Sequence, residues 1–357
     1  MRVLFIVPEM LVDDLRGRAI GFLKRYPRFY RRLHGFPPVR ANLVHPHLHV
    51  WQIWGGTLNV MRHCGLARSM GADAALVTPS GKNTYGRFNV VDVPYVGWSD
   101  IRADDLVVVP DFASELVNRL EGPVIVYLQN PQLVYNNYDY MSSRVTLWTD
   151  SPFMVDVCRS ILPGREVPIV PNIVDPVTFP YRPQSEREPV VFAFPRKGPE
   201  YIEATQEEYT RLGGKHFRFE LIHGLSLFEL AKAMQRPQVF LASAEIEGCA
   251  LPPQESMACG MVVVGKSARG ANFAMEHRRT AMVAETPQEA AQCLRELEDL
   301  ALRDSIARRA RELISRYFPE NEPTALWRST LARCGIAYAP NLVGYHRQYE
   351  RTARQYS

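Results

Sequence analysis

Short runs of apolar residues recur along the chain and predict buried strands. Most of these runs are continuous rather than alternating, which is typical of strands buried on both faces of a parallel sheet. The candidate strands cover residues 3–7, 74–78, 106–109, 124–128, 145–148, 190–194, 217–222, 239–242 and 261–264.

Amphipathic segments between these runs predict helices. After the Gly55-Gly56 pair, Gly71 stands where a helix is expected to end, because glycine readily ends a helix. Thr286 is followed by a proline and, three residues after it, by an acid, which is typical of a helix start. Between the glycines, apolar residues repeat at helical spacing: Val60, Cys64, Ala67 and Met70. The alternation of strands and helices predicts an α/β fold of βαβ units.

The length and a break in the pattern predict two domains. The 357 residues exceed one ordinary core and suit two. Residues 179–189, which read FPYRPQSEREP, are rich in proline and charge and separate two sets of strands, as an interdomain linker does. We expect a first Rossmann-like domain over residues 1–180, a second over 181–316, and a helical segment over 317–357 that crosses back to the first.

The composition is that of a globular protein. Hydrophobic residues make up 46% and charged residues 22%, which argues against disorder. No apolar run approaches the roughly 20 residues of a membrane-spanning helix, and residues 3–7 are too few for the core of a signal peptide. We therefore expect a cytoplasmic protein. The 6 cysteines are scattered without a C-x-x-C pair, so neither a zinc site nor a disulfide framework is indicated.

A basic insert over about residues 9–54 separates the first strand from the Gly55-Gly56 pair. From Leu15 to Ala72 there is no acidic residue, and such a surface attracts anions. A basic amphipathic helix is typical of a membrane surface, so residues 16–40 could bind anionic lipid. The alternative is a helix that packs on its own domain with a solvated basic face. The apolar residues expected on one face of this helix are Phe22, Tyr26, Phe29, Tyr30 and Leu33.

The most specific motif is EGCALPPQESMACG, residues 247–260. Glu247 and Glu255 are separated by seven residues. The turn between them runs into Pro252-Pro253, which suits the first turn of a helix and would place Glu255 on that turn. Exposed N–H groups at a helix N-terminus suit a diphosphate, and carboxylates accept hydrogen bonds from sugar hydroxyls.

This motif resembles the E-x7-E motif of retaining glycosyltransferases with the GT-B fold, particularly family four. The family pattern is close to E-G-F-G-L-P-x-x-E-A-M-A-C-G-x-P-V-V, from which this chain departs at Cys249, Ala250, Ser256 and Met261. The resemblance implies two Rossmann-like domains that face each other across a donor and acceptor cleft. It also implies that Glu255 binds the nucleotide ribose, that Glu247 binds donor-sugar hydroxyls, and that the turn from Gly248 to Leu251 contacts the donor.

Other segments follow the order of the same family. Residues 170–175 and Phe179 resemble the I-P-N-G-V-D-x-x-x-F that ends its first domain, with Ile173 in place of glycine. In FAFPRKG, residues 192–198, the resemblance assigns Arg196 and Lys197 to the leaving diphosphate, whose charge cations stabilise. An ordinary basic turn is the alternative.

Two glycine-containing turns complete the resemblance. His223 and Gly224 resemble the family loop that contacts the base, although a glycine turn after a strand is common. Gly55 and Gly56 resemble the family's glycine-rich turn, where the backbone can approach phosphate or acceptor, and a plain tight turn is the alternative.

The family's first-domain histidine has no counterpart. Gln129 and Asn130 occupy the expected position, and neither is a general base. The nearby histidines are candidates by their pKa, although a histidine in an apolar stretch is more often structural: His45, His47, His49 and His63. The chain has no D-x-D sequence, which fits a metal-independent enzyme.

The resemblance implies sugar transfer from a nucleotide-diphosphate donor to an acceptor hydroxyl with retention, in bacterial glycan or glycolipid synthesis. Beyond the donor substrate no cofactor and no metal is expected. The partners expected are a glycan or lipid-linked acceptor and an anionic membrane surface at the inner face of the membrane, with no nucleic acid. Two alternatives stay open: a non-catalytic module that binds nucleotide sugar, and a GT-B sugar-nucleotide epimerase. A nicotinamide-dependent dehydrogenase is disfavoured because Pro8-Glu9-Met10, not G-x-G-x-x-G, follows the first strand.

Overall fold

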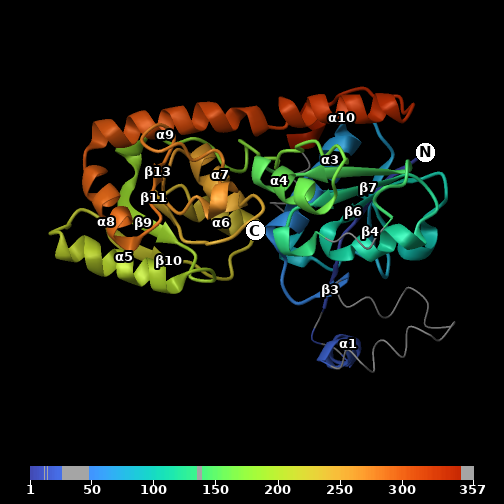
Figure 1. The fold of residues 1–357 in the computed structure, drawn as a ribbon, viewed down its shortest axis with the longest axis horizontal. Helices are drawn as coiled ribbons and strands as arrows, with labels where there is room; N and C mark the ends of the chain where they lie inside the picture. Colours follow the sequence, from blue (N-terminus) through green and yellow to red (C-terminus); the bar gives the residue numbers. More distant parts are fainter. Residues whose placement is uncertain (12, 14, 26–47, 135–138, 347–357) are drawn as a thin grey trace. The chain divides into compact units, whose positions relative to one another are not determined.

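The chain forms two compact units, each built on one parallel sheet (Figure 1). The structure, a computed structural model, describes residues 1–11, 13, 15–25, 48–134 and 139–346. The first unit comprises Met1–Thr149, Cys158–Pro168 and Thr324–Ser357, and the second comprises Asp150–Val157 and Ile169–Pro323.

The first unit contains a six-stranded parallel sheet in the order β5-β4-β1-β6-β7-β8. In register, Val3 of β1 pairs with Ala74 of β4 on one side and Leu106 of β6 on the other. A separate pair joins β2 (Glu9–Met10) to β3 (His49–Val50). The strands of the main sheet are β1 (Val3–Ile6), β4 (Ala74–Thr78), β5 (Tyr95–Gly97), β6 (Leu106–Pro110), β7 (Val124–Leu128) and β8 (Val145–Thr149).

Helix α3 (Gly55–Ser69) confirms the helix predicted after the glycine pair. The four apolar residues of its predicted face are all buried, and Gly71 follows its C-cap with φ +91°. The unit's other helical segments are α1 (Leu15–Arg25), η3 (Gly86–Phe88), η4 (Trp98–Asp100), η5 (Asp111–Arg119), η6 (Pro131–Leu133) and part of α4 (Pro152–Ile161).

The C-terminal part of the chain packs into the first unit. From Thr324 onward, α10 (Glu322–Arg333) and the residues after it belong to that unit. Trp327 is fully buried, and its ring nitrogen donates to Nδ1 of His63 at 3.0 Å. Its ring lies 5.4 Å from that of Phe5 and 5.5 Å from that of Trp148. This aromatic cluster fixes α10 against the first unit's sheet.

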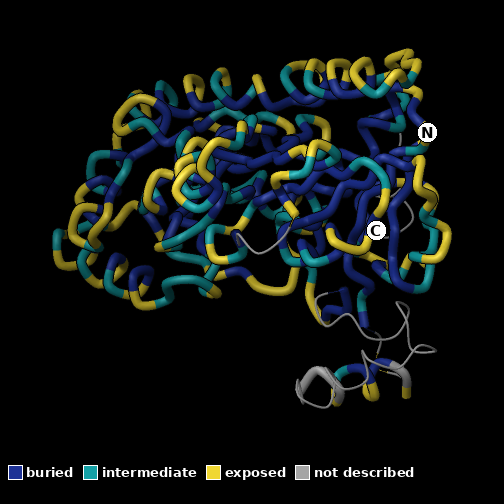
Figure 2. The backbone as a smooth tube through the Cα atoms, turned by 45° about the vertical axis from the view of Figure 1, so that its right-hand side comes forward, coloured by how far each residue is buried: buried dark blue, intermediate teal, exposed yellow. Residues whose placement is uncertain are grey.

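The second unit contains a five-stranded parallel sheet in the order β10-β9-β11-β12-β13. Its strands are β9 (Glu188–Ala193), β10 (Arg218–Leu221), β11 (Pro237–Ala242), β12 (Val262–Gly265) and β13 (Met282–Val283). Its helices are α5 (Pro199–Arg211), α6 (Leu227–Ala233), α7 (Leu251–Cys259), α8 (Pro287–Glu296) and α9 (Leu300–Ile314), with short turns η7 (Gln184–Glu186), η8 (Ala268–Gly270) and η9 (Ser315–Tyr317). Burial is greatest along the strands (Figure 2).

The sequence pattern agrees with this architecture. Each candidate strand is present, and Thr286 caps α8 with the predicted capping box. The strands that the pattern missed are short: β5 and β13 at the sheet edges, and the pair of β2 and β3. Residues 179–189, predicted as a linker, lie in the second unit, where Phe179 and Gln184 are fully buried. The predicted face at residues 26–33 lies outside the described residues.

Candidate functional site

The ends of β9 and β11 bring two of the predicted segments together. Because the two strands are parallel neighbours, the segments that follow them start at the same, carboxyl edge of the sheet, where ligands of open α/β sheets bind. Ser243 Oγ donates to the carbonyl oxygen of Lys197 and fixes one segment to the other. Gly198 follows with φ +73°, and a Cβ there would lie 2.5 Å from the carbonyl oxygen of Ser243. Glycine is therefore required at this contact.

Lys197 and Glu247, two of the predicted site residues, form an ion pair. Lys197 Nζ lies 2.5 Å from Glu247 Oε1, and the two side chains are 40% and 23% exposed. Arg196 is exposed, and within the described ranges it has no hydrogen bond or ion pair. Of these two neighbouring cations, Lys197 is held by a carboxylate, whereas Arg196 has no described partner and can bind an anion.

Two hydrogen bonds to backbone carbonyl groups hold the turn that follows Glu247. Ser151 Oγ donates to the Gly248 carbonyl at 2.6 Å, and Asn172 Nδ2 donates to the Cys249 carbonyl at 3.1 Å. In a trans peptide the N–H points opposite to the carbonyl. The N–H groups of Cys249 and Ala250 therefore point away from Ser151 and Asn172, and neither bonds to another described backbone group. These amides can serve as donors to a ligand.

Helix α7 begins without a side-chain cap. Its N-cap is Ala250, and its second and third residues are prolines, which have no N–H. An anion at this terminus would therefore depend on the turn amides and on Leu251. The helix starts at Leu251, so Glu255 is its fifth residue and lies just beyond the predicted first turn, with 2% exposure. Gly260 ends the helix with φ +90°.

The opposite end of α7 is capped by arginines. Arg311 donates to the Ala258 carbonyl at 2.7 Å, and Arg187 donates to the Cys259 carbonyl. Burial lowers the pKa of both guanidinium groups, for Arg187 to about 10. Cations at a helix C-terminus interact favourably with the helix dipole. The negative end of the α7 dipole is therefore balanced by two arginines, whereas its positive end, at the candidate site, has no side-chain cap.

Cys249 is unsuited to act as a nucleophile. Burial, and secondarily the charge of Asp150, raise the pKa of its thiol well above the ordinary value. Its Sγ also accepts a hydrogen bond from Gln254 Nε2 at 2.8 Å. A protonated thiol is a weak nucleophile, so this residue shapes the turn rather than reacting.

His223 and Gly224 follow the edge strand β10 and are exposed. Gly224 has φ +64°, a conformation that favours glycine, and Ser226 then caps α6 through a capping box with Glu229. His223 makes no hydrogen bond or ion pair in the part of the chain that is described. The two residues lie on the carboxyl side of the sheet, where a base-contacting loop is expected.

The first unit has its own polar group at a carboxyl edge. Gly55 and Gly56 begin α3, and a Cβ at Gly56 would lie 3.1 Å from Oε1 of Gln129. Buried Asp111, after β6, accepts hydrogen bonds from the N–H groups of Phe112, Gln129 and Asn130 at 2.7, 2.8 and 2.6 Å. Burial raises its pKa to about 6 although the three hydrogen bonds oppose this.

Asp111 was missed by the sequence reasoning. An acid directly after a fully buried parallel strand was the available signal, because that position lies at the edge where ligands bind. Of the candidate histidines, His49 and His63 are buried, and His63 serves as an acceptor for Trp327. His45 and His47 lie outside the described residues.

Neither a metal cluster nor a membrane span is found in the parts of the chain that are described. Over residues 1–11, 13, 15–25, 48–134 and 139–346, no group of three or more His, Cys, Asp and Glu side chains could hold a metal ion. Over the same ranges, no helix has the length and apolarity that crossing a bilayer requires.

Part of the second unit matches a known protein family. Residues 200–321 match the family model described as "Glycosyl transferase-like". This range contains Glu247, Glu255 and the turn between them, but not Arg196 and Lys197. No curated protein sequence matches the chain.

Several solved glycosyltransferases have a similar structure. Sucrose-phosphate synthase from Thermosynechococcus elongatus matches 93% of this chain and 98% of its own, with 13% identity and a TM-score of 0.56. HepE from Anabaena, solved with UDP, matches 93% and 99%, with 14% identity and a TM-score of 0.50. The pneumococcal O-GlcNAc transferase GtfA, solved with UDP and GlcNAc, matches 67% of this chain and 58% of its own, with 12% identity and a TM-score of 0.52.

These likenesses establish the fold. The two parallel sheets with their helices have the GT-B architecture, as the sequence predicted. The chain spans a little more than half the length of the pneumococcal enzyme, at 58% of that chain.

Proposed function

We propose that this chain is a glycosyltransferase that moves a hexose or deoxyhexose from a nucleotide-diphosphate donor to an acceptor hydroxyl, with retention and without a metal. Bacterial glycan or glycolipid synthesis is the proposed setting. The observation that carries the proposal is the ion pair of Lys197 with Glu247 beside the exposed guanidinium of Arg196, which has no partner among the described residues. This pair joins the two segments that the sequence assigns to diphosphate and sugar.

The proposed roles follow from charge and hydrogen bonding. Arg196 and Lys197 stabilise the negative charge that grows on the leaving diphosphate, and the amides of Cys249 and Ala250 add neutral donors. Lys197 has three N–H donors, so it can keep its bond to Glu247 while it binds a phosphate oxygen. Glu247 then orients sugar hydroxyls beside the diphosphate, and Glu255 binds the ribose.

Retention without a protein nucleophile is part of this proposal. Cys249 stays protonated, and Lys197 holds one oxygen of Glu247. A front-face displacement through an oxocarbenium-like transition state requires from the protein only prearranged charge, which the two cations supply. They also supply the positive charge that metal-dependent transferases take from a cation.

A thermal-shift panel of UDP, GDP, dTDP, ADP and CDP tests the donor site. UDP comes first because the similar HepE and GtfA structures contain it. A ligand that binds only the folded protein raises the melting temperature. We expect one nucleotide to do so, and Arg196→Ala to reduce the shift. The matched control is Arg218→Ala, which removes a half-exposed arginine that pairs with Glu188 and should leave the shift unchanged. If no nucleotide stabilises the wild type, the donor site is refuted.

Turnover of the matching nucleotide sugar separates the alternatives. A transferase releases nucleotide faster when acceptor is added, an epimerase converts the sugar without releasing nucleotide, and a binding module does neither. Glu247→Gln should retain nucleotide binding while transfer falls about 100-fold or more, as when a group that acts in the transition state is removed. Unchanged transfer by this variant would remove Glu247 from the proposed mechanism.

A further inference from the structure

The segment after β11 carries two acids that pair with lysines from the two neighbouring strands. In the sheet, β11 lies between β9 and β12. Glu247 pairs with Lys197, which follows β9, and Oε2 of Glu245 lies 2.5 Å from Nζ of Lys266, which follows β12. Two residues of extended chain span at most about 7 Å. A charge on Glu245 is therefore close enough to act on an anion bound beside Glu247.

The backbone around Lys266 is held independently of its side chain. Its N–H donates to the carbonyl oxygen of Ala242 at 2.9 Å, and its own carbonyl accepts from Nδ2 of Asn272, a buried residue, at 3.0 Å. The preceding Gly265 approaches β11 so closely that a Cβ there would lie 2.1 Å from the Ala242 carbonyl oxygen. A substitution of the Lys266 side chain should therefore leave the course of both segments unchanged.

The two partners of the second ion pair differ in exposure. The side chain of Lys266 is 18% exposed, and that of Glu245 is 61% exposed. Nζ of Lys266 also lies 5.1 Å from the centroid of the Tyr201 ring, an arrangement that favours a cation. The hydrogen bond from Lys266, and more weakly the charge of Arg269, lower the pKa of Glu245. If the lysine were removed, the exposed acid would keep its charge at neutral pH without its partner.

We propose that Lys266 acts through Glu245 as a positioning residue for donor binding: it neutralises this acid, which would otherwise repel the diphosphate bound by Arg196 and Lys197. At physiological ionic strength, charges closer than about 8 Å are only partly screened, so an uncompensated carboxylate weakens the binding of an anion nearby. The inference rests on the proposed donor site. It adds two residues, Lys266 and Glu245, that the sequence did not assign to that site.

Two other roles for Lys266 predict different results. If its ion pair only stabilised the local fold, Lys266→Met and Glu245→Gln would both weaken nucleotide binding. If Lys266 contacted the phosphates directly, Lys266→Met would weaken binding whether or not Glu245 is charged. Neutralisation makes the two single substitutions act in opposite directions, because the first leaves an extra negative charge and the second an extra positive charge.

Calorimetric titration of the full chain with UDP, or with the nucleotide diphosphate that the thermal-shift panel selects, tests the proposal. Lys266→Met keeps an apolar stem beside Tyr201, and we expect it to raise the dissociation constant about fivefold without lowering the melting temperature. Glu245→Gln should bind up to about threefold more tightly than the wild type, and the double variant should return to within about twofold of it. At about 1 M salt, the ratio between Lys266→Met and the wild type should approach one.

The matched control is Arg211→Met in the same unit, which makes the same change in net charge. Arg211 pairs with Glu208 at 2.5 Å and is the last residue of α5, which leads to the amino end of β10. This variant should bind UDP as the wild type does. A double variant that binds as weakly as Lys266→Met, weaker binding by Glu245→Gln, or an equal loss in Arg211→Met would each overturn the proposal. A wild type that binds no nucleotide would instead refute the proposed donor site itself.

Discussion

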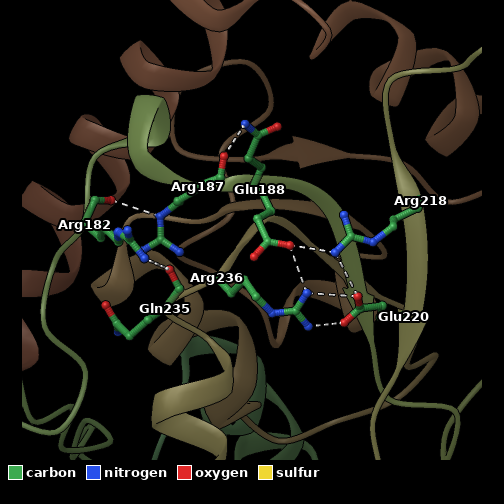
Figure 3. Close-up of polar contacts among 8 residues, drawn as sticks. Arg182, Arg187, Glu188, Arg218, Glu220, Gln235 and Arg236 are labelled. Atoms are coloured by element: carbon green, nitrogen blue, oxygen red, sulfur yellow. Dashed lines mark hydrogen bonds and ion pairs between the residues drawn. The ribbon is translucent and has the colours of Figure 1, made fainter.

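The charged side chains at the two ends of the second unit's sheet are paired differently. At the amino end, Arg236 contacts Glu188 at 3.0 Å and both oxygens of Glu220, and Arg218 contacts the same two acids at 2.6 and 3.2 Å (Figure 3). These pairs lower the pKa of both acids. At the carboxyl end, each described lysine pairs with one acid, Lys197 with Glu247 and Lys266 with Glu245, and Arg196 has no described partner. The charge network is closed at one end and open at the other.

The backbone shows the same contrast. At the amino end Arg187 donates to the carbonyls of Arg182, Met234, Pro237 and Cys259, so one buried side chain joins the start of two strands to the end of α7. At the carboxyl end the amides of Cys249 and Ala250 bond to no other described backbone group. The paired groups at the amino end stabilise the fold, whereas the backbone N–H groups at the carboxyl end that have no described backbone partner can bind a ligand.

Removing Arg187 should have the largest effect on stability. Arg187→Met leaves several buried carbonyls without a donor, and we expect the free energy of unfolding to fall by about 4 kcal/mol. Urea denaturation followed by circular dichroism measures this loss. Arg236→Met is the control at the same end, and because its partners are partly exposed it should cost only about 0.5 kcal/mol. Equal losses would mean that burial does not distinguish these arginines.

Removing Lys197 should weaken nucleotide binding while leaving stability almost unchanged, the opposite of the effect expected for Arg187. Lys197→Ala breaks a partly exposed ion pair, so stability should change little, but the dissociation constant of the nucleotide should rise about 30-fold, as for a charge-assisted hydrogen bond. Calorimetric titration with the nucleotide that the thermal-shift panel selects measures this rise. The comparison between the two ends fails if Lys197→Ala destabilises the protein as much as Arg187→Met does.

The sequence predicted the features that lie within one segment, but not the hydrogen bonds between residues that are far apart in the chain. The apolar runs and the E-x7-E spacing lie within single segments, so the strands and the two glutamates could be placed. Ser151, Asn172 and Ser243 could not be assigned, because each fixes a carbonyl group of a residue far along the chain. Glu255 lies one residue further into the helix than predicted because Leu251 joins the helix ahead of the prolines.

The contact of Gly198 with Ser243 should have a moderate effect. Gly198→Ala places a Cβ against a backbone carbonyl and keeps φ positive, so we expect a loss of about 2 kcal/mol and weaker nucleotide binding as Lys197 moves. Gly213→Ala is the control, because Gly213 has φ +75° with no atom near its Cβ position, and it should lose only about 1 kcal/mol. Thermal denaturation and the nucleotide shift are measured for both. Indistinguishable results would show that the contact with Ser243 can relax.

The smallest effect is expected at Asp111, a buried acid whose described hydrogen-bond donors are backbone N–H groups. Its folded pKa of about 6 lies above the ordinary value of 3.8, so the native state holds the proton more tightly. The contribution of Asp111 to stability is therefore greatest below the ordinary value and declines as pH rises through 6. Protonation also converts one acceptor oxygen to a donor, which should release an amide of Gln129 or Asn130.

Amide resonances of these residues should therefore titrate together with a midpoint near pH 6 in NMR spectra, while the rest of the sheet stays unchanged. Asp111→Asn should abolish that titration, since its amide does not ionise, whereas Asp104→Asn, which alters an exposed acid in the same unit, should preserve it. A titration that survives Asp111→Asn would assign the proton to another group. Asp111 would then stay ionised over this pH range. Its charge would be stabilised by backbone N–H groups, as the charges of Glu188 and Glu220 are stabilised by arginines.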